Sequence, residues 1–390
     1  MSTTRLYYTD SYLTSFDARV VDLADDGRRV YLDRSAFYPT SGGQPNDTGA
    51  LAECSVTDVI DEGERIAHVL ASPLGADTRD VTGTIDFARR FDHMQQHTGQ
   101  HLLSAVLEEM FGHHTVSVHF GADYSSLDLD VDALSSERVI EAEMRANAIV
   151  AENRPVSIGF EETAAAAGLR KASDREGTLR IVSIEGLDRS ACGGTHVRAT
   201  GEIGAILIRK VERVRKSARL EFVCGLRAVR RARADFEALS RIATSLSASL
   251  DDAPALVGAQ SEQLRAVEND RRRQDRELAA FRARALYDAA AANAGGARVV
   301  RRDGATMNEL RALAQAFATL PKSVLVGTVA EPPSVLVATS EDSGLDAGRV
   351  VREAVTSVGG RGGGSARVAQ GSVPDRSRLD DVVRALMSAL

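Results

Sequence analysis

His97-Thr-Gly-Gln-His101 is the stretch around which the rest of the chain can be placed. Two histidines four residues apart lie on one face of a helix and can hold a single metal ion. The other side of the same helix would be buried by four apolar residues that follow, Leu102, Leu103, Val106 and Leu107. This pattern predicts a helix over residues 91–111 with a polar face and a core face.

A second pair of metal-binding residues occurs far downstream, in Cys192-Gly-Gly-Thr-His196. It adds a thiolate and a third imidazole, and three imidazoles with one thiolate suit a tetrahedral Zn²⁺ ion. We therefore predict that His97, His101, Cys192 and His196 bind zinc. His93, one turn earlier on the same helix face, is an alternative ligand, although we favour a half-buried histidine outside the ligand set.

The predicted zinc site has a structural and a functional interpretation. A closed site with four protein ligands often only holds loops together. Structural sites, however, favour two or more cysteines in short knuckles, whereas this set joins a helix to a distant loop. We therefore expect a functional metal that positions substrate or water, with a structural zinc as the alternative.

The composition sets broad limits on the protein. A chain of 390 residues should form two or three domains, and a hydrophobic content of 43% supports a core without disulfides. Three cysteines favour a reducing, cytoplasmic location over a disulfide framework. We find no apolar run that could span a membrane and no signal-peptide core. The net charge of −7 means that any nucleic-acid binding must come from local basic patches.

The patterning predicts an α+β multidomain fold. Residues 1–88 contain short strands separated by turns, which predicts a small β-barrel. Residues 89–231 combine helices and strands and would form the metal-binding α+β domain. Residues 232–294 are rich in alanine and arginine and predict a coiled-coil-like helical spacer, broken near Pro254, that could join two copies as a homodimer. Residues 295–390 predict an α/β module.

A polar segment separates the two predicted hairpins of the barrel. It reads Phe37-Tyr-Pro-Thr-Ser-Gly-Gly-Gln-Pro-Asn-Asp-Thr-Gly49, which is too polar and glycine-rich for a core strand. It is either a connecting loop or a backbone-lined wall that closes over a small substrate.

Two further segments could contact phosphates. A strand predicted over residues 201–211 leads into a dense basic patch, made of Arg209, Lys210, Arg213, Arg215, Lys216 and Arg219. This patch is either a solvated face or a phosphate-binding surface beside the metal. Near the C-terminus, Gly359-Gly-Arg-Gly-Gly-Gly-Ser365 is either a flexible hinge or a turn whose N–H groups cradle phosphates.

These motifs resemble the editing half of alanyl-tRNA synthetase and the freestanding alanyl-tRNA editing proteins. The resemblance rests on FYPTSGGQPNDTG, HTGQHLL, CGGTHV with the following ATGEIG, and RLE at residues 219–221. The C-terminal GGRGGGSARVAQG resembles the glycine-rich signature of the DHHA1 domain. The order of the segments is similar to the long freestanding form, and the resemblance covers nearly the whole chain.

The resemblance implies a hydrolase that removes a wrong amino acid, mainly serine with glycine as a second candidate, from alanine-specific tRNA. It implies Zn²⁺ at the four ligands and no aminoacylation activity, because the chain begins at the barrel. Implied catalytic contacts are Gln44, Thr48 and His119, where synthetase editing domains carry Gln at the last position. The implied pocket wall consists of Ser41, Gly42, Gly43, Asn46 and Asp47, and implied tRNA contacts are the basic patch with Arg361, Gly362, Gly363 and Gly364.

Two other functions remain open from the sequence. One is a zinc hydrolase that acts on small aminoacyl esters or peptides without RNA. The other is an RNA-binding protein whose zinc is only structural.

Overall fold

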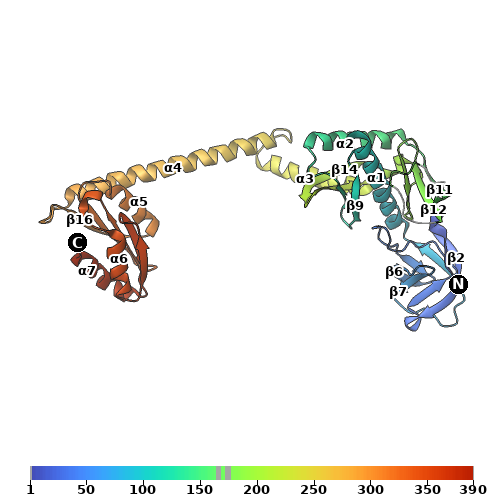
Figure 1. The fold of residues 1–390 in the computed structure, drawn as a ribbon, viewed down its shortest axis with the longest axis horizontal. Helices are drawn as coiled ribbons and strands as arrows, with labels where there is room; N and C mark the ends of the chain where they lie inside the picture. Colours follow the sequence, from blue (N-terminus) through green and yellow to red (C-terminus); the bar gives the residue numbers. More distant parts are fainter. Residues whose placement is uncertain (1, 164–167, 172–176, 390) are drawn as a thin grey trace. The chain divides into compact units, whose positions relative to one another are not determined.

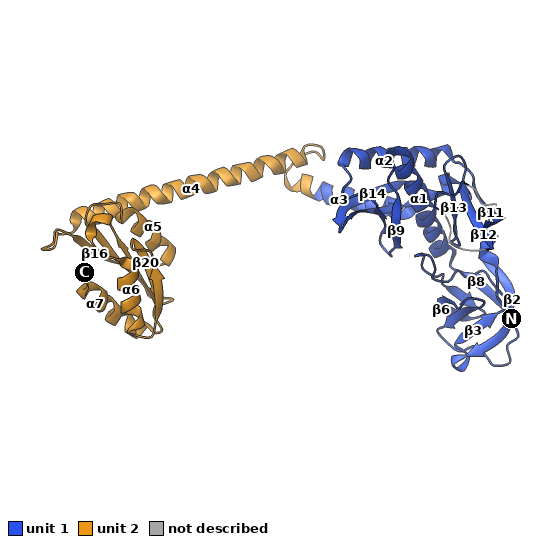
Figure 2. Cartoon of the chain, viewed as in Figure 1, with its two compact units in different colours: residues 1–241 blue, residues 242–390 orange. Residues whose placement is uncertain are grey.

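The computed structural model describes residues 2–163, 168–171 and 177–389 (Figure 1). The chain divides into two compact units, residues 1–241 and 242–390 (Figure 2). The predicted α+β class is confirmed, with a closed barrel near the N-terminus and an α/β module at the C-terminus. The predicted division into four segments, at residues 88, 231 and 294, stays a proposal.

Six strands close the barrel in the order β2-β3-β7-β6-β5-β8. Side chains alternate between the inside and the outside of the barrel along each strand. In β8 every second residue points inward, so Val81 and Ile85 join the barrel core. The barrel strands are β2 (Ser15–Ala24), β3 (Arg29–Leu32), β5 (Gly49–Leu51), β6 (Cys54–Asp61), β7 (Ile66–Leu70) and β8 (Asp80–Ile85). A short parallel pair, β1 (Thr4–Arg5) with β4 (Arg34–Ser35), lies outside this barrel.

Helix α1 (Phe87–Phe111) follows the barrel and carries the HTGQH stretch. It begins earlier than residue 91 because the Asp86 side chain accepts a hydrogen bond from the Arg89 backbone N–H and so caps the first turn. Gly112 ends the helix in the left-handed conformation, with φ of 68°. The predicted helix is therefore confirmed, with one additional turn at its start.

Two sheets and a second helix surround α1 in the first unit. The four-stranded sheet has the order β14-β15-β10-β9, and the three-stranded sheet has the order β11-β12-β13. The first contains β14 (Ile206–Val214), β15 (Ser217–Cys224), β10 (Ser125–Leu129) and β9 (Thr115–Phe120). The second contains β11 (Val156–Glu162), β12 (Thr178–Ile184) and β13 (Asp188–Ala191). Helix α2 (Ser136–Glu152) contributes Ala142, Ala146 and Ile149 to the same core.

The strand predicted over residues 201–211 is partly wrong. Residues Thr200–Ile203 form a 3-10 turn, and the strand begins only at Ile206. The Thr200 hydroxyl donates to the Ile149 carbonyl at 2.8 Å, and this bond holds the turn against the end of α2. Other 3-10 turns are η1 (Leu6–Tyr8), η2 (Asp25–Gly27), η5 (Glu341–Ser343) and η6 (Arg376–Arg378).

The spacer is helical, as predicted. Helix α3 (Gly225–Ser245) and helix α4 (Ala253–Ala289) are separated by the predicted break, and Pro254 lies in the first turn of α4. Apolar residues of α4 are exposed, among them Leu264 at 61% and Phe281 at 74%. Assembly into a homodimer through the spacer stays a prediction.

The second unit contains a five-stranded sheet in the order β16-β17-β18-β20-β19. Apolar clusters cover it, one around α6 and α7 and one around α5 and the end of α4. Its elements are β16 (Arg298–Gly304), α5 (Met307–Phe317), β17 (Ser323–Val329), β18 (Ser334–Thr339), α6 (Ala347–Thr356), β19 (Arg361–Gly364), β20 (Val368–Ser372) and α7 (Leu379–Ser388).

The central part of the glycine-rich segment is a strand, and not the hinge or turn that the sequence left open. Gly362 and its neighbours form strand β19, whose register pairs it with β20. A Cβ atom on Gly362 would lie only 2.9 Å from Val355 Cγ2 of α6. The glycines therefore let α6 approach the edge of the sheet closely, and contact of residues 361–364 with tRNA stays a prediction.

No helix in the described part of the chain combines the length and the apolar character that crossing a membrane requires.

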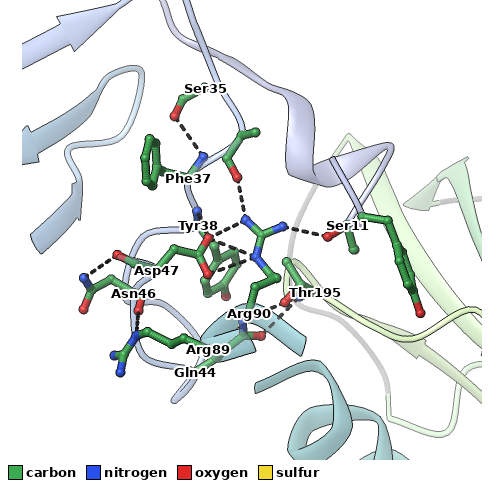
Figure 3. Close-up of polar contacts among 12 residues, drawn as sticks. Ser11, Ser35, Phe37, Tyr38, Gln44, Asn46, Asp47, Arg89, Arg90 and Thr195 are labelled. Carbon is green, nitrogen blue, oxygen red and sulfur yellow. Dashed lines mark hydrogen bonds and ion pairs between the residues drawn. The ribbon is translucent and has the colours of Figure 1, made fainter. Parts of the chain in front are cut away.

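A buried ion pair joins the barrel to the start of α1. The Arg90 guanidinium is fully buried and its Nε lies 2.9 and 3.0 Å from the two carboxylate oxygens of Asp47 (Figure 3). Arg90 also donates to the carbonyls of Ser11 at 2.8 Å and Ala36 at 2.6 Å, while Asp47 accepts from the Tyr38 backbone N–H. Asp47 is therefore a structural partner of Arg90 and not, as predicted, part of a substrate-facing wall.

Replacing Asp47 with asparagine should destabilise the first unit strongly. The Arg90 cation would stay buried without its anion, which costs about 3–5 kcal/mol when one partner of a buried pair is removed. Urea unfolding followed by circular dichroism measures the change in the free energy of unfolding. Asp22→Asn is the control, because Asp22 pairs with Arg65 on the surface and should leave the unfolding midpoint unchanged. Equal midpoints for both variants would contradict this role of the ion pair.

Candidate metal centre and active site

Four predicted ligands converge in the first unit. The potential donor atoms of His97, His101, Cys192 and His196 all lie within 4.8 Å of one another. The Cys192 Sγ is 3.4 Å from His97 Nε2 and 3.3 Å from His196 Nε2. Two ligands come from α1 and two from the segment that follows β13, so the cluster forms only when these elements pack together.

Each of the three imidazoles is oriented through its other ring nitrogen. His97 Nδ1 lies 2.8 Å from Gln44 Oε1, and His101 Nδ1 lies 2.8 Å from Asp188 Oδ2. The third ring, His196, has its Nδ1 3.1 Å from Thr98 Oγ1. These contacts leave each Nε2 facing the cluster, which is the arrangement that metal-binding histidines adopt.

Close approach of the Cys192–His196 segment to α1 requires a glycine. A Cβ atom on Gly194 would lie 2.1 Å from His97 Cε1 and 3.0 Å from Gln44 Oε1. The Thr195 backbone N–H donates to Gln44 Oε1 at 3.2 Å, and Gln44 Nε2 donates to the Thr195 hydroxyl at 2.8 Å (Figure 3). Gln44 thus ties the polar loop of the barrel to the ligand segment and to a ligand ring.

The electrostatics of the cluster favour a thiolate. Burial alone raises the pKa of the Cys192 thiol, but its interactions with His97, His196 and His101 outweigh burial and hold the pKa well below the usual value. Burial lowers the pKa of His196 to about 3. A thiolate with three oriented imidazoles is a donor set that fits a metal ion.

Asp188 supports the cluster with a negative charge. Burial would raise its pKa, but the hydrogen bond to His101 and the charges of His101 and Arg170 lower it to about 2. Burial lowers the pKa of His101, and the Asp188 bond overcomes this and raises it to about 9. Arg170 Nε donates to the other Asp188 oxygen at 2.7 Å. The carboxylate is therefore ionised and fixed on both sides.

A pocket of about 770 Å³ opens beside the cluster, and we call it the Cys192 pocket. His97 and Cys192 form part of its lining, together with Ser41 and Gly42 of the polar loop. Three tyrosines, Tyr7, Tyr8 and Tyr38, and the strand residue Arg180 form much of the remainder. The cluster is thus open to a small substrate on one side.

The other predicted pocket residues lie elsewhere. Gln44 is buried, its amide contacts Thr195 and His97, and it is not among the residues that line the Cys192 pocket, so it orients a ligand. Asn46 and Thr48 are not among the residues that line the Cys192 pocket, and the backbone carbonyl of Thr48 accepts from the Asp86 N–H. A Cβ atom on Gly43 would contact the Phe120 ring at 3.5 Å. The role of Thr48 in substrate selection stays a prediction.

His119 does not reach the cluster. It is exposed on β9, whereas the next residue, Phe120, is buried and packs its ring 5.0 Å from the His97 ring. Neighbouring residues of a strand point to opposite faces, so His119 faces away from His97. The implied catalytic contact of His119 stays a prediction, and its side chain lies on the face of β9 opposite to Phe120. His93 is buried but lies outside the ligand cluster, in line with the favoured interpretation.

Four members of the predicted basic patch carry carboxylate partners. Arg219 binds Asp128 at 2.7 and 2.9 Å. The other paired cations are Arg209 with Asp235, Lys210 with Glu212, and Arg213 with Asp132. Only Arg215 and Lys216, on the turn between β14 and β15, have no acidic partner among the described residues. The patch is therefore less positive than its sequence indicates.

Sequence reasoning missed three residues that shape the site. Asp188 and Thr98 hold ligand rings, and Arg180 lines the Cys192 pocket. Asp188 precedes the CGGTH motif and Thr98 lies inside HTGQH, so a search for partners of the ligand histidines could have proposed both. Arg180 has no such signal, because its position follows from the pairing of β12 with β13.

Replacing Asp188 with asparagine should weaken metal binding by about 10- to 100-fold, because the charged partner of a ligand histidine is lost. A Co²⁺ titration followed by visible absorption, with competition by Zn²⁺, measures the affinity. Asp128→Asn is the matched control, since Asp128 lies on β10 and pairs with Arg219. Unchanged affinity in Asp188→Asn would show that the carboxylate does not support the ligand.

Two families match segments of the chain. Residues 179–220 match the threonyl and alanyl tRNA synthetase second additional domain, and residues 292–390 match the DHHA1 domain. The first match includes Cys192 and His196, and the second includes strands β16 to β20.

Full-length relatives extend the likeness. The alanyl-tRNA editing protein AlaX-L of Pyrococcus horikoshii is 30% identical over 95% of this chain and 94% of its own length. AlaX-M of Methanosarcina acetivorans is 38% identical over 55% of this chain and 95% of its own length. The alanine–tRNA ligase of Methanoregula boonei is 32% identical over 97% of this chain but only 42% of its own length. The chain belongs to the alanyl-tRNA editing protein family.

Proposed function

We propose that this protein is a trans-editing hydrolase that cleaves the ester between a wrong amino acid and alanine-specific tRNA. The wrong amino acid is mainly serine, with glycine as a second substrate. The observation that carries the proposal is the convergence of one thiolate and three oriented imidazoles beside the Cys192 pocket, which His97 and Cys192 line. Family membership supports the tRNA substrate and the editing activity.

The metal in this proposal is Zn²⁺, held by His97, His101, Cys192 and His196. The set of donors supports it, because imidazole and thiolate are the ligands that zinc prefers in proteins. When bound, the ion polarises a carbonyl oxygen and orients the ester or a water molecule.

The residues of the chain keep that site in one geometry. Gln44, Asp188 and Thr98 hold the three ligand rings, and Gly194 lets the ligand segment approach α1. The Tyr38 hydroxyl donates to the Ser41 carbonyl at 3.0 Å and fixes the loop that borders the pocket. A substrate ester would therefore enter a preorganised cavity, which reduces the entropy that binding must overcome.

A second site for serine has a physical reason. A synthetase pocket that accepts the methyl group of alanine cannot strongly reject an added hydroxyl. A separate pocket that forms a hydrogen bond with the hydroxyl leaves its own polar group unpaired when alanine enters. We therefore expect hydrolysis of Ser-tRNA(Ala) and sparing of Ala-tRNA(Ala).

Chelation of the metal should abolish deacylation of Ser-tRNA(Ala). The measurement is release of labelled serine by the metal-loaded protein, before and after dialysis against a chelator and again after addition of Zn²⁺. His101→Ala should lose the activity and keep the circular dichroism spectrum of the folded protein. A His101→Ala variant that unfolds would instead favour a structural zinc in an RNA-binding protein.

Free serine esters distinguish the proposed function from the remaining alternative, a hydrolase of small aminoacyl esters that does not need RNA. Free serine esters should be hydrolysed far less efficiently than Ser-tRNA(Ala), because only the latter offers the RNA end. Equal kcat/KM for both substrates would favour a small-ester hydrolase.

Lack of aminoacylation, a cytoplasmic location and a homodimer are further parts of the proposal, and an assay with alanine, ATP and tRNA tests the first of them.

A further inference from the structure

Two guanidinium groups border the Cys192 pocket, and they are paired differently. Arg5 binds the Asp61 carboxylate at 2.7 and 2.8 Å and donates to the Gly63 carbonyl. Arg180 donates only to backbone carbonyls, from Nε to Tyr8 at 2.9 Å and from Nη1 to Cys192 at 2.6 Å. Arg180 Nη2 is buried and has no hydrogen-bond partner among the described residues.

The unpaired nitrogen belongs to a buried cation that lines the Cys192 pocket. Only 7% of Arg180 is exposed, and burial lowers the pKa of its guanidinium, although arginine stays protonated in proteins. A buried donor without a partner costs about 1–3 kcal/mol, and more when the group is charged. The fold therefore retains a cation with one unsatisfied nitrogen among the residues that line the Cys192 pocket.

Arg180 is fixed relative to Cys192. Its backbone carbonyl accepts from the Cys192 N–H at 3.0 Å, while its side chain donates to the Cys192 carbonyl. Both contacts follow from the pairing of β12 with β13 and from the position of Cys192 just after β13. The free N–H groups on Nη2 consequently have a fixed position beside the proposed zinc ligand.

We propose that Arg180 is a substrate-binding residue whose Nη2 donates to an anionic oxygen of the aminoacylated RNA end. This inference rests on the proposed function. Two oxygens have the required charge: a nonbridging oxygen of the phosphodiester before the terminal nucleoside, and the oxyanion formed at the ester carbonyl. In the second case water adds to the carbonyl carbon and the carbonyl electron pair moves to oxygen. Collapse then breaks the ester C–O bond, and the RNA hydroxyl leaves with a proton.

The surroundings of Arg180 favour the phosphodiester. The Tyr8 ring centre lies 5.5 Å from the Arg180 guanidinium carbon and 5.6 Å from that of Arg5. Phe160 also lines the pocket and is 50% exposed. Aromatic faces next to an unpaired guanidinium are typical of sites for single-stranded RNA, where bases stack and phosphates bind cations.

Steady-state deacylation by the Arg180→Met variant distinguishes a contact with the phosphodiester from a contact with the oxyanion. The substrates are Ser-tRNA(Ala) and 2′(3′)-O-seryl-adenosine, which has no phosphate. With a phosphodiester contact, KM for the tRNA should rise about 10- to 100-fold, the value of one charged hydrogen bond, and the nucleoside should be unaffected. With an oxyanion contact, kcat should fall by a similar factor on both substrates. Unchanged kcat and KM on both substrates would overturn the proposal.

The zinc content of the variants and a conservative substitution distinguish substrate binding by Arg180 from a purely structural role. If Arg180 only fastens Cys192, Arg180→Met should lose bound Zn²⁺ together with activity, and this result would also overturn the proposal. Arg180→Lys keeps the charge but not the planar fork, so it should restore part of the lost binding while zinc content stays at the wild-type level. Arg65→Met is the control, because Arg65 lies on the barrel and pairs with Asp22.

Binding of an RNA that carries no amino acid tests the role of Arg180 even if the proposed hydrolysis fails. The probe is a short oligonucleotide ending in CCA, compared with adenosine alone, and fluorescence anisotropy reports the affinity. Weaker binding of the oligonucleotide by Arg180→Met, in a protein that retains its zinc, supports the phosphate contact regardless of catalysis. Equal binding by wild type and variant, combined with unchanged kcat, would contradict it.

Discussion

The buried ion pair between Arg90 and Asp47 is the contact on which the site depends. Arg90 lies seven residues before His97, and residues at this spacing share a helix face. The pair therefore fixes the polar loop of the barrel on the same side of α1 that presents the ligands. Gln44, three residues before Asp47, then reaches both His97 and Thr195. One ion pair in the core thus sets the distance between the barrel and the ligand cluster.

Local patterns predicted the parts of the structure that depend on neighbours in sequence. The spacing of His97 and His101 and the apolar residues after them defined α1, and alternation defined the barrel strands. The break at Pro254 was equally local. Contacts between distant segments were not accessible in this way. Asp188, which lies 87 residues after His101, orients that ring only because β13 packs beside α1.

The errors have physical causes of the same kind. The resemblance implied His119 as a catalytic contact, but the strand alternation that buries Phe120 turns it to the opposite face. The basic run around Arg219 looked positive because its carboxylate partners, such as Asp128, come from other strands and helices. The glycines around Gly362 were interpreted as either a hinge or a phosphate cradle, whereas their lack of side chains serves the packing of Val355. In each case the prediction considered a residue alone, without the partner that folding brings next to it.

Arg180 differs from the other polar residues of the site in its hydrogen-bond partners. Gln44, Asp188 and Thr98 use their polar atoms to hold ligand rings, and Arg90 uses every nitrogen of its guanidinium. In such a network an unsatisfied donor lowers stability until a partner reaches it. The free nitrogen belongs to Arg180, which lines the Cys192 pocket together with His97 and Cys192. Its desolvation is compensated once an anionic oxygen enters, which makes the same atom a source of binding energy for the substrate.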